Sequence, residues 1–265
     1  MNGRQAMTHI YAFANQKGGV GKTTTVISLA AYLSAMGKKL LLIDVDPQAN
    51  ATSSLGVDKN RLPLSIYEAL VQQVPLSQVV MPMDEVGLEL VPSSPSLAGA
   101  TVEITRLPER THLLRKALAT LDRRYDYIFI DAPPSLGILT VNALTATEGV
   151  IIPVQCEYLS LEGLGQLVHT INLVRNQLNP RLKIAGLVMT MYDVRTKISQ
   201  QVVDEVRKYF SNKVFSTIIP RNVRLSEAPS YGETILSYAP RSSGALAYQA
   251  LAKEFLRRMN QTGGK

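Results

Sequence analysis

At 265 residues, with 46% hydrophobic and 18% charged residues, the chain has the size and composition of one soluble α/β domain with a sizeable core. Its single cysteine, Cys156, excludes an internal disulfide and any cysteine-only metal or iron–sulfur site within one chain. The net charge of +7 favours an acidic partner, and without a membrane-length apolar run or a signal-peptide core we expect a cytoplasmic protein.

Apolar runs alternate with helical patterns along almost the whole chain. The runs predict strands at Ile10–Ala14, Lys39–Val45, Leu88–Pro92, Tyr127–Asp131, Gly149–Val154, Ile184–Thr190 and Val214–Ile219. The segments between them predict helices at about 22–36, 65–72, 110–124, 137–147, 160–178, 197–210, 223–229 and 243–259. Such apolar strands, separated by helices, predict a mostly parallel twisted sheet with helices on both faces. We therefore expect a single α/β domain at 9–259, between flexible ends at 1–8 and 260–265.

A glycine-rich run joins the first predicted strand to the first predicted helix. Its sequence is Gln16-Lys17-Gly18-Gly19-Val20-Gly21-Lys22-Thr23-Thr24. Strand, glycine loop, Lys-Thr and helix are the phosphate-binding P-loop arrangement, in which backbone N–H groups and the helix N-terminus meet phosphate oxygens. Lys22 is predicted to reach the β- and γ-phosphates, and the Thr23 hydroxyl to hold Mg²⁺. Gln16 replaces the usual first glycine, and a plain turn is the simpler alternative, but the full context favours a nucleoside triphosphate site.

Two predicted strands end in acidic residues near this loop, where open α/β sheets bind their ligands. Asp44 and Asp46 stand at one strand tip, and alternation along a strand puts both side chains on the same side of the sheet. Tyr127–Asp131 is typical of a Walker B strand, which places Asp131 near Mg²⁺ through water. We assign Asp46 to the attacking water and place both Asp44 and Asp46 near the Mg²⁺ shell; a polar strand end before a proline turn is the alternative. Residues 47–50 and 132–137 then resemble switch segments that sense the γ-phosphate.

The positive charge is concentrated in one part of the chain. Residues 175–224 carry a net charge of +7, equal to the excess of the whole protein. The basic residues there are Arg175, Arg181, Lys183, Arg195, Lys197, Arg207, Lys208, Lys213, Arg221 and Arg224. This concentration suggests a polyanionic partner, either nucleic acid or an acidic membrane surface. A scattered, solvated basic face is the alternative, and charge alone does not decide between them.

The glycine-rich run resembles the deviant Walker A motif of the MinD/ParA class of P-loop ATPases, because Lys17 precedes Gly18 in Lys-Gly-Gly-Val-Gly-Lys-Thr-Thr. Three further runs look like the ParA/Soj branch of that class. They are Asp44-Val-Asp-Pro-Gln-Ala-Asn-Ala-Thr52, Asp131-Ala-Pro-Pro-Ser-Leu136 and Ile219-Pro-Arg-Asn-Val-Arg-Leu-Ser-Glu-Ala-Pro-Ser-Tyr-Gly232. The resemblance runs from about residue 8 to 257, and it indicates a short, Soj-type chromosome or plasmid partition ATPase.

The resemblance implies an ATP- and Mg²⁺-dependent sandwich dimer with two nucleotides at the interface. Lys17 of each subunit would then reach the phosphates of its partner, as an arginine finger does. Gly18 would sit where the two loops face each other, so a side chain there should clash. Adenine recognition in the family comes partly from the segment that matches Pro220, Arg221 and Asn222. A helix cap is the alternative role for Arg221 and Asn222.

The family's DNA-binding residues match positions inside the basic window. Arg195, with Lys197 close behind it, and Arg224 are the residues concerned. This coincidence favours non-specific double-stranded DNA over a membrane. The resemblance also implies a partner of the ParB/Spo0J type that stimulates slow hydrolysis, splits the dimer and releases it from DNA. We therefore expect a cytoplasmic, nucleoid-associated protein with no membrane partner.

Three rival functions share the fold. A MinD-like membrane-positioning ATPase would need a basic amphipathic C-terminal helix, and core packing explains the apolar stripe of residues 248–259 more simply. A reductase like the nitrogenase iron protein needs two cysteines per subunit, which Cys156 alone cannot supply. A small-molecule ligase or synthetase would hold a second substrate beside the γ-phosphate, and no feature of the sequence suggests such a pocket.

Overall fold

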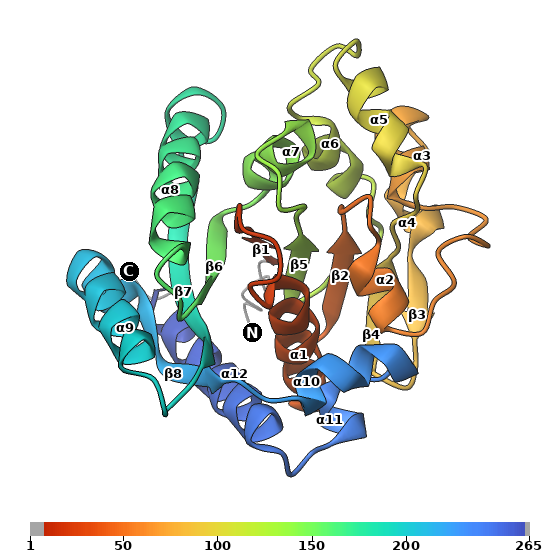
Figure 1. The fold of residues 1–265 in the computed structure, drawn as a ribbon. Helices are drawn as coiled ribbons and strands as arrows, with labels where there is room; N and C mark the ends of the chain where they lie inside the picture. Colours follow the sequence, from red (N-terminus) through yellow and green to blue (C-terminus); the bar gives the residue numbers. More distant parts are fainter. Residues whose placement is uncertain (1–7, 263–265) are drawn as a thin grey trace, which may run out of the picture.

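The computed structural model describes residues 8–262, whose centre is an eight-stranded sheet in the order β3-β4-β2-β5-β1-β6-β7-β8 (Figure 1). Neighbouring strands run parallel, except that β3 is antiparallel to β4. The strands are β1 (His9–Phe13), β2 (Leu40–Asp44), β3 (Met81–Met83), β4 (Leu88–Val91), β5 (Tyr127–Asp131), β6 (Gly149–Gln155), β7 (Lys183–Tyr192) and β8 (Val214–Pro220). The predicted mostly parallel sheet is confirmed.

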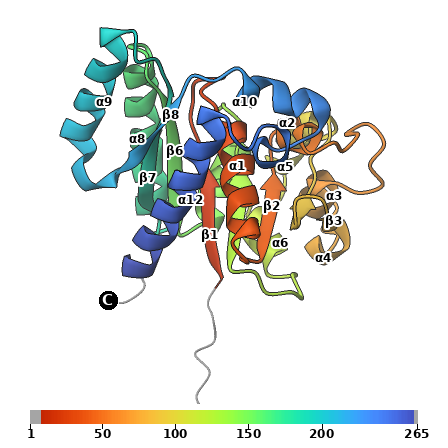
Figure 2. The same cartoon turned by 90° about the horizontal axis from the view of Figure 1, so that it is seen from below.

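Helices cover both faces of this sheet, as expected. One face carries α1 (Lys22–Ala35), α2 (Asn50–Ser54), α10 (Arg224–Glu227), α11 (Ile235–Tyr238) and α12 (Ser243–Thr262). The other carries α3 (Ile66–Val71), α4 (Leu76–Val79), α5 (Leu97–Ile104), α6 (Leu113–Leu118), α7 (Ile138–Ala146), α8 (Ser160–Gln177) and α9 (Lys197–Phe210). Figure 2 shows α1 and α12 side by side across the first face.

The strands separate two hydrophobic cores because successive side chains point to opposite faces. In β5, Tyr127 and Phe129 face α1 and α12, whereas Ile128 and Ile130 face the helices on the other side. The sequence therefore reads as a continuous apolar run, as expected for strands that are buried on both faces. This packing fixes the strand ends, and with them the loops that carry the polar residues.

The sequence missed several short elements. Strand β3 has only three residues with a proline at its centre, and helices α2, α4, α5 and α11 have four to eight residues each. Elements this short carry too few residues for a periodic pattern. Helix α6 is also shorter than the helix predicted at 110–124. A turn around Glu109, whose φ is +50°, delays its start to Leu113, and the helix ends at Leu118.

The two ends of the chain are described only in part. Of the flexible ends expected at 1–8 and 260–265, residues 1–7 and 263–265 lie outside the described part. Thr8 donates a hydrogen bond to the Tyr125 carbonyl (2.8 Å), and α12 continues to Thr262. Within residues 8–262, no helix is long and apolar enough to cross a membrane.

A buried carboxylate ties α12 to the edge strand β8. Glu254 accepts hydrogen bonds from the backbone N–H of Ser216 (2.7 Å) and Thr217 (2.9 Å), and it pairs with Arg258 (2.8 Å). Burial by itself raises the pKa of Glu254, but the N–H donors and Arg258 outweigh it and hold the pKa below its usual value. The ionised form is thus the one that the fold stabilises.

We expect Glu254→Gln to lower the free energy of unfolding by about 2–3 kcal/mol at neutral pH, because one backbone N–H and Arg258 lose their charged partner. Since the folded pKa lies below the unfolded one, this contribution is complete above about pH 4.5 and is lost as the pH falls through the folded pKa. Urea unfolding at several pH values measures it. Glu85→Gln, which changes an exposed acid, is the control, and an equal effect there would contradict the assignment.

Candidate nucleotide site and nucleic-acid interface

The glycine-rich loop between β1 and α1 has the backbone of a phosphate loop. Gly19 and Gly21 have φ angles of +72° and +78°, in the left-handed region that favours glycine, and Gly21 is the N-cap of α1. Asn15 holds the start of the loop, since its side chain accepts from the Lys17 N–H (3.0 Å) and donates to the Pro153 carbonyl (2.6 Å). The loop is therefore tied to the neighbouring strand β6.

Lys22 and Thr23 meet the acidic end of β5. The Lys22 ammonium donates to one oxygen of Asp131 (2.5 Å), and the Thr23 hydroxyl donates to the other (2.7 Å). Lys22 and Asp131 are both buried. A buried pair of this kind costs desolvation energy that the hydrogen bonds must offset, so it is a weak source of stability and a frequent sign of a functional site.

Asp44, the last residue of β2, and Asp46, two residues further on, have separate surroundings. Asp44 pairs with Asp131 across the β2–β5 ladder and is fully buried, where it accepts from the Thr52 N–H (2.9 Å) and hydroxyl (2.8 Å). Burial and the neighbouring Asp131 carboxylate raise the pKa of Asp44, although Thr52 opposes the rise. Asp46 lies beyond the end of the strand, and its carboxylate accepts from the Gln48 N–H (3.0 Å). The prediction that strand alternation places the Asp44 and Asp46 side chains on the same side of the sheet therefore does not apply, because Asp46 is not part of the strand.

The acids come together without forming a metal site of their own. Asp131 lies within electrostatic reach of both Asp44 and Asp46. Across residues 8–262, however, no three Asp, Glu, His or Cys side chains form a group that could hold a metal ion. Mg²⁺ commonly takes one or two protein ligands and completes its shell with water and substrate phosphates, so this donor set suits a cation that enters with a phosphate.

Lys17 faces away from the buried pair. Its ammonium donates to Gln155 (3.1 Å) and lies 3.4 Å from Glu157, and its side chain is 30% exposed. A Cβ atom built at Gly18 or Gly19 would meet no heavy atom of residues 8–262 within 4 Å. The outer side of the loop is thus open.

The segment that follows β8 lies beside the end of β7. Pro220 pairs with Tyr192, and the Arg221 N–H donates to the Tyr192 carbonyl (2.9 Å). The Arg221 guanidinium reaches Glu157 (3.1 Å), so Glu157 contacts both Arg221 and Lys17. The Asn222 side chain accepts from the Arg224 backbone N–H two residues on (2.9 Å), in a turn just before Val223, the N-cap of α10, which itself has no side-chain cap.

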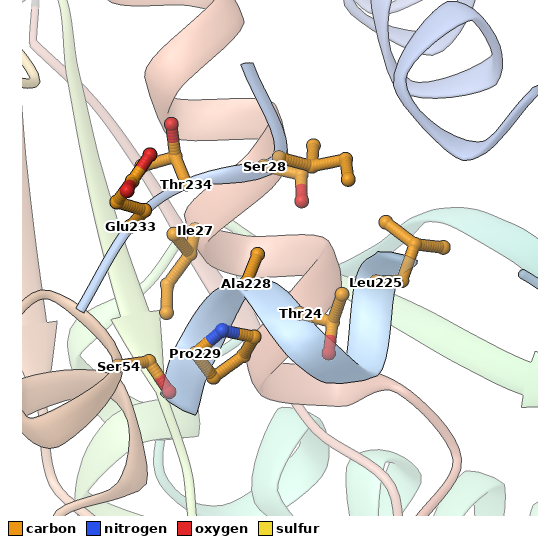
Figure 3. Close-up of a pocket in the computed structure, with 10 residues that line it drawn as sticks. Thr24, Ile27, Ser28, Ser54, Leu225, Ala228, Pro229, Glu233 and Thr234 are labelled. Carbon is orange, nitrogen blue, oxygen red and sulfur yellow. The ribbon is translucent and has the colours of Figure 1, made fainter. Parts of the chain in front are cut away.

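A small cavity lies between this segment and α1 (Figure 3). Its walls include Thr24 and Ser28 of α1, Leu225 of α10 and Pro229 just after α10. Its volume of about 20 Å³ accommodates a water molecule and excludes an adenine ring. The cavity is therefore a gap in the packing next to the loop and not a base-binding pocket.

The candidate DNA-binding residues follow neighbouring strands at the same edge of the sheet. Arg195 comes three residues after β7 and Arg224 four residues after β8, and their side chains are 81% and 58% exposed. Arg195 pairs with Asp193 and Arg224 with Glu227, each at 2.7 Å. Lys197 is exposed at the first residue of α9.

Comparisons with known proteins identify the family. A family model described as an AAA domain matches residues 8–184. The chromosome-partitioning ATPase Soj of Thermus thermophilus is 54% identical over 250 residues, covering 94% of this chain and 96% of its own length. The sporulation initiation inhibitor protein Soj of Bacillus subtilis is 51% identical, covering 94% of this chain and 98% of its own. The chain belongs to the Soj/ParA family of partition ATPases.

A solved structure supports the fold and bears on the ligand. The cobyrinic acid a,c-diamide synthase of Mycobacterium smegmatis, with bound ADP and magnesium, has a TM-score of 0.84 and is 41% identical, covering 96% of each chain. Its name describes a small-molecule reaction. The two Soj relatives are more similar in sequence, and this chain spans almost their full length, so we interpret its sites within the Soj/ParA family.

Several residues around the loop escaped the sequence analysis. The Thr190 hydroxyl donates to the Val20 carbonyl (2.8 Å) and ties the loop to β7, and Met191, with a φ of +53°, lies next to Gly21. Thr52 holds Asp44, and Glu157 joins Lys17 to Arg221. Only two of these positions offered a signal in the sequence, Thr52 as the last residue of the run that begins at Asp44, and Glu157 two residues beyond the end of a strand.

Proposed function

We propose that this partition ATPase binds double-stranded DNA non-specifically as an ATP-bound dimer, and that hydrolysis stimulated by a ParB-type partner releases it in the cytoplasm. The observation that carries the proposal is the position of Lys17, on the open side of the phosphate loop and at the same edge of the sheet as Arg195 and Arg224. A dimer joined through this edge would bring two sets of cations together.

The residues of the phosphate loop fit ATP with Mg²⁺. The two left-handed glycines free the backbone N–H groups to face phosphate oxygens, and Lys22 can exchange Asp131 for a phosphate. Thr23 would hold Mg²⁺ directly, with Asp131 and Asp44 beyond it. Mg²⁺ when bound neutralises the charge on the phosphate oxygens. Asp46 would orient the attacking water and accept its proton.

The remaining residues at this edge of the sheet would contact the adenine base and the second subunit. Pro220, Arg221 and Asn222 would contact adenine, although the Asn222 side-chain oxygen also accepts from the Arg224 backbone N–H. Lys17 would leave Gln155 and Glu157 and reach the phosphates of the partner subunit as a point charge. The nucleotide would thus hold two subunits together.

DNA binding would follow from dimerisation. A single subunit offers few phosphate contacts, whereas a dimer doubles Arg195, Lys197 and Arg224. Each phosphate that is neutralised releases condensed counterions, so the affinity rises and its salt dependence steepens. No base readout is required, since phosphate contacts carry no sequence information.

The test is binding to a random-sequence duplex with Mg²⁺ and either ATP or ADP across a salt series. We expect binding with ATP only, and a dimer that makes about six phosphate contacts should lose roughly 10³-fold in affinity between about 50 and 200 mM salt. Equal binding with ADP would refute the nucleotide-gated dimer. Absence of binding in both states would direct attention to membranes or to a small-molecule substrate.

A substitution on the open side of the loop tests the dimer. Gly18→Val should leave ATP binding within about twofold, because a Cβ atom at this position meets no heavy atom of residues 8–262 within 4 Å, and should prevent ATP-dependent dimerisation. Light scattering and nucleotide titration measure the two effects. Gly99→Val, on α5, is the control for adding the same side chain elsewhere. A dimer formed by the Gly18 variant would contradict the steric argument.

A further inference from the structure

Arg195 and Asp193 form a two-point contact in the loop between β7 and α9. The Arg195 Nε donates to one carboxylate oxygen of Asp193 (2.9 Å), and its Nη2 donates to the other (2.7 Å). The first oxygen also accepts from the Arg195 backbone N–H (3.0 Å). Only 18% of the Asp193 side chain is exposed, against 81% of the Arg195 side chain. The acid is therefore set into the loop, and the guanidinium stands out from it.

The contact leaves a defined part of the guanidinium available. Arginine carries five N–H groups in a plane, and Asp193 takes two of them along one edge. The two Nη1 hydrogens and the second Nη2 hydrogen remain. Nη1 and Nη2 form the end-on fork that matches two oxygens of one phosphate.

The loop itself is fixed by further hydrogen bonds. The Thr196 N–H and hydroxyl both donate to the Asp193 carbonyl (3.1 Å each), and the Asp193 N–H donates to the Ser199 hydroxyl (3.3 Å). Ser199 is a buried residue in the first turn of α9. These hydrogen bonds fix the backbone at Asp193, so that its carboxylate can hold the long Arg195 side chain in place.

We propose that Asp193 is a positioning residue for DNA, which holds the Arg195 fork towards a phosphate before contact. This inference rests on the proposed function. A free arginine loses rotamer freedom when it binds, at a cost of about 0.5–1.5 kcal/mol for each immobilised side chain, which corresponds to roughly twofold to tenfold in affinity. Because Asp193 already restricts the Arg195 side chain in the folded protein, less rotamer freedom is lost on binding, and more of the contact energy appears as DNA affinity.

The rival effect of Asp193 is electrostatic and has the opposite sign. A carboxylate beside a DNA-binding arginine repels phosphate, so its removal would strengthen binding if repulsion dominated. The 2.7 Å two-point geometry favours positioning, because it fixes the guanidinium plane as well as its distance. Arg224 differs, since Nη1 of its guanidinium contacts Glu227, an acid that also accepts from the Tyr238 hydroxyl (3.1 Å).

The test is Asp193→Asn, measured in the full-length protein with ATP and Mg²⁺ on a random duplex. The asparagine carbonyl can still accept from the Arg195 backbone N–H, while the amide nitrogen cannot accept from Nη2. We expect DNA affinity to fall by roughly fourfold to a hundredfold, that is twofold to tenfold for each of the two arginines of a dimer, although the net charge of each subunit rises by one. Thermal melting and ATP-dependent dimerisation should be unchanged.

Asp204→Asn is the matched control, because Asp204 is an exposed acid of α9 that contacts Gln200 (2.8 Å) and, within the described part of the chain, forms no ion pair with an arginine. It should leave affinity unchanged or slightly stronger. In an Arg195→Ala background, Asp193→Asn should have no weakening effect. Tighter binding by Asp193→Asn, or equal effects of the two Asn variants, would overturn the inference. Failure of the unaltered protein to bind DNA would overturn the proposed function instead.

Discussion

Arg195→Glu is expected to weaken ATP-dependent DNA binding by roughly a hundredfold or more, while ATP hydrolysis without DNA stays within about twofold. The reason is electrostatic, since a dimer loses two cations from the DNA-facing surface and acquires two anions there. The slope of log affinity against log salt should also fall by about two, one for each phosphate that is no longer neutralised. Fluorescence anisotropy on a labelled duplex across a salt series measures both quantities.

A charge change of the same kind at the other end of the sheet provides the control. Arg181 is exposed and precedes β7 at the amino end of the strand, whereas Arg195 follows β7 at the carboxyl end. Arg181→Glu should therefore reduce affinity only slightly, through long-range repulsion. Equal reductions in both variants would mean that DNA responds to overall charge and not to this edge. A parallel loss of hydrolysis with Arg195→Glu would indicate a structural role.

Asp46→Ala should reduce ATP hydrolysis by about 10²- to 10⁴-fold, the range expected when a general base is removed. ATP binding should persist, because Lys22, Thr23 and the loop glycines are untouched. The variant should accumulate as an ATP-bound dimer on DNA that a ParB-type partner does not release. Phosphate release and DNA dissociation after an ATP chase measure the two consequences.

The control must distinguish the loss of the Asp46 charge from the loss of its packing. Asp46 is buried, and its backbone carbonyl accepts from the Ser93 hydroxyl (2.7 Å), so Asp46→Asn preserves the volume while removing the charge. Asp58→Asn changes an exposed acid in the loop after α2 and should hydrolyse normally. Normal turnover in both Asp46 variants would remove this residue from the mechanism.

The sequence predicted the strands that build the site because they are buried on both faces. Tyr127–Asp131 was predicted with its exact ends, and the Asp44–Asp131 neighbourhood follows from two such strands lying side by side. A strand of this kind cannot shift by one residue without moving its side chains to the opposite core. Burial on both faces therefore allows the ends of these strands to be predicted from the sequence, and the glycine-rich motif predicts the phosphate loop between β1 and α1.

The partners of the charged side chains could not be predicted in the same way. Lys17 meets Glu157 across 140 positions of sequence, and Arg221 meets the same acid across 64. Such contacts depend on which strands become neighbours and on side-chain directions at exposed loops, where no periodic pattern acts. The tie between Glu254 and β8 escaped prediction for the same reason.

The two borders of the sheet limit how copies of the chain can assemble. At one border, the N–H groups of Ser216 and Thr217 in β8 are already bonded to Glu254. At the other, β3 has three residues, and the central one, Pro82, has no N–H to offer. An added strand would find few free donors at either border, so growth of a continuous sheet from one subunit into the next is disfavoured. The dimer proposed above would therefore be joined through loops or helices, where contacts can form and dissociate without disrupting the hydrogen bonds of the sheet.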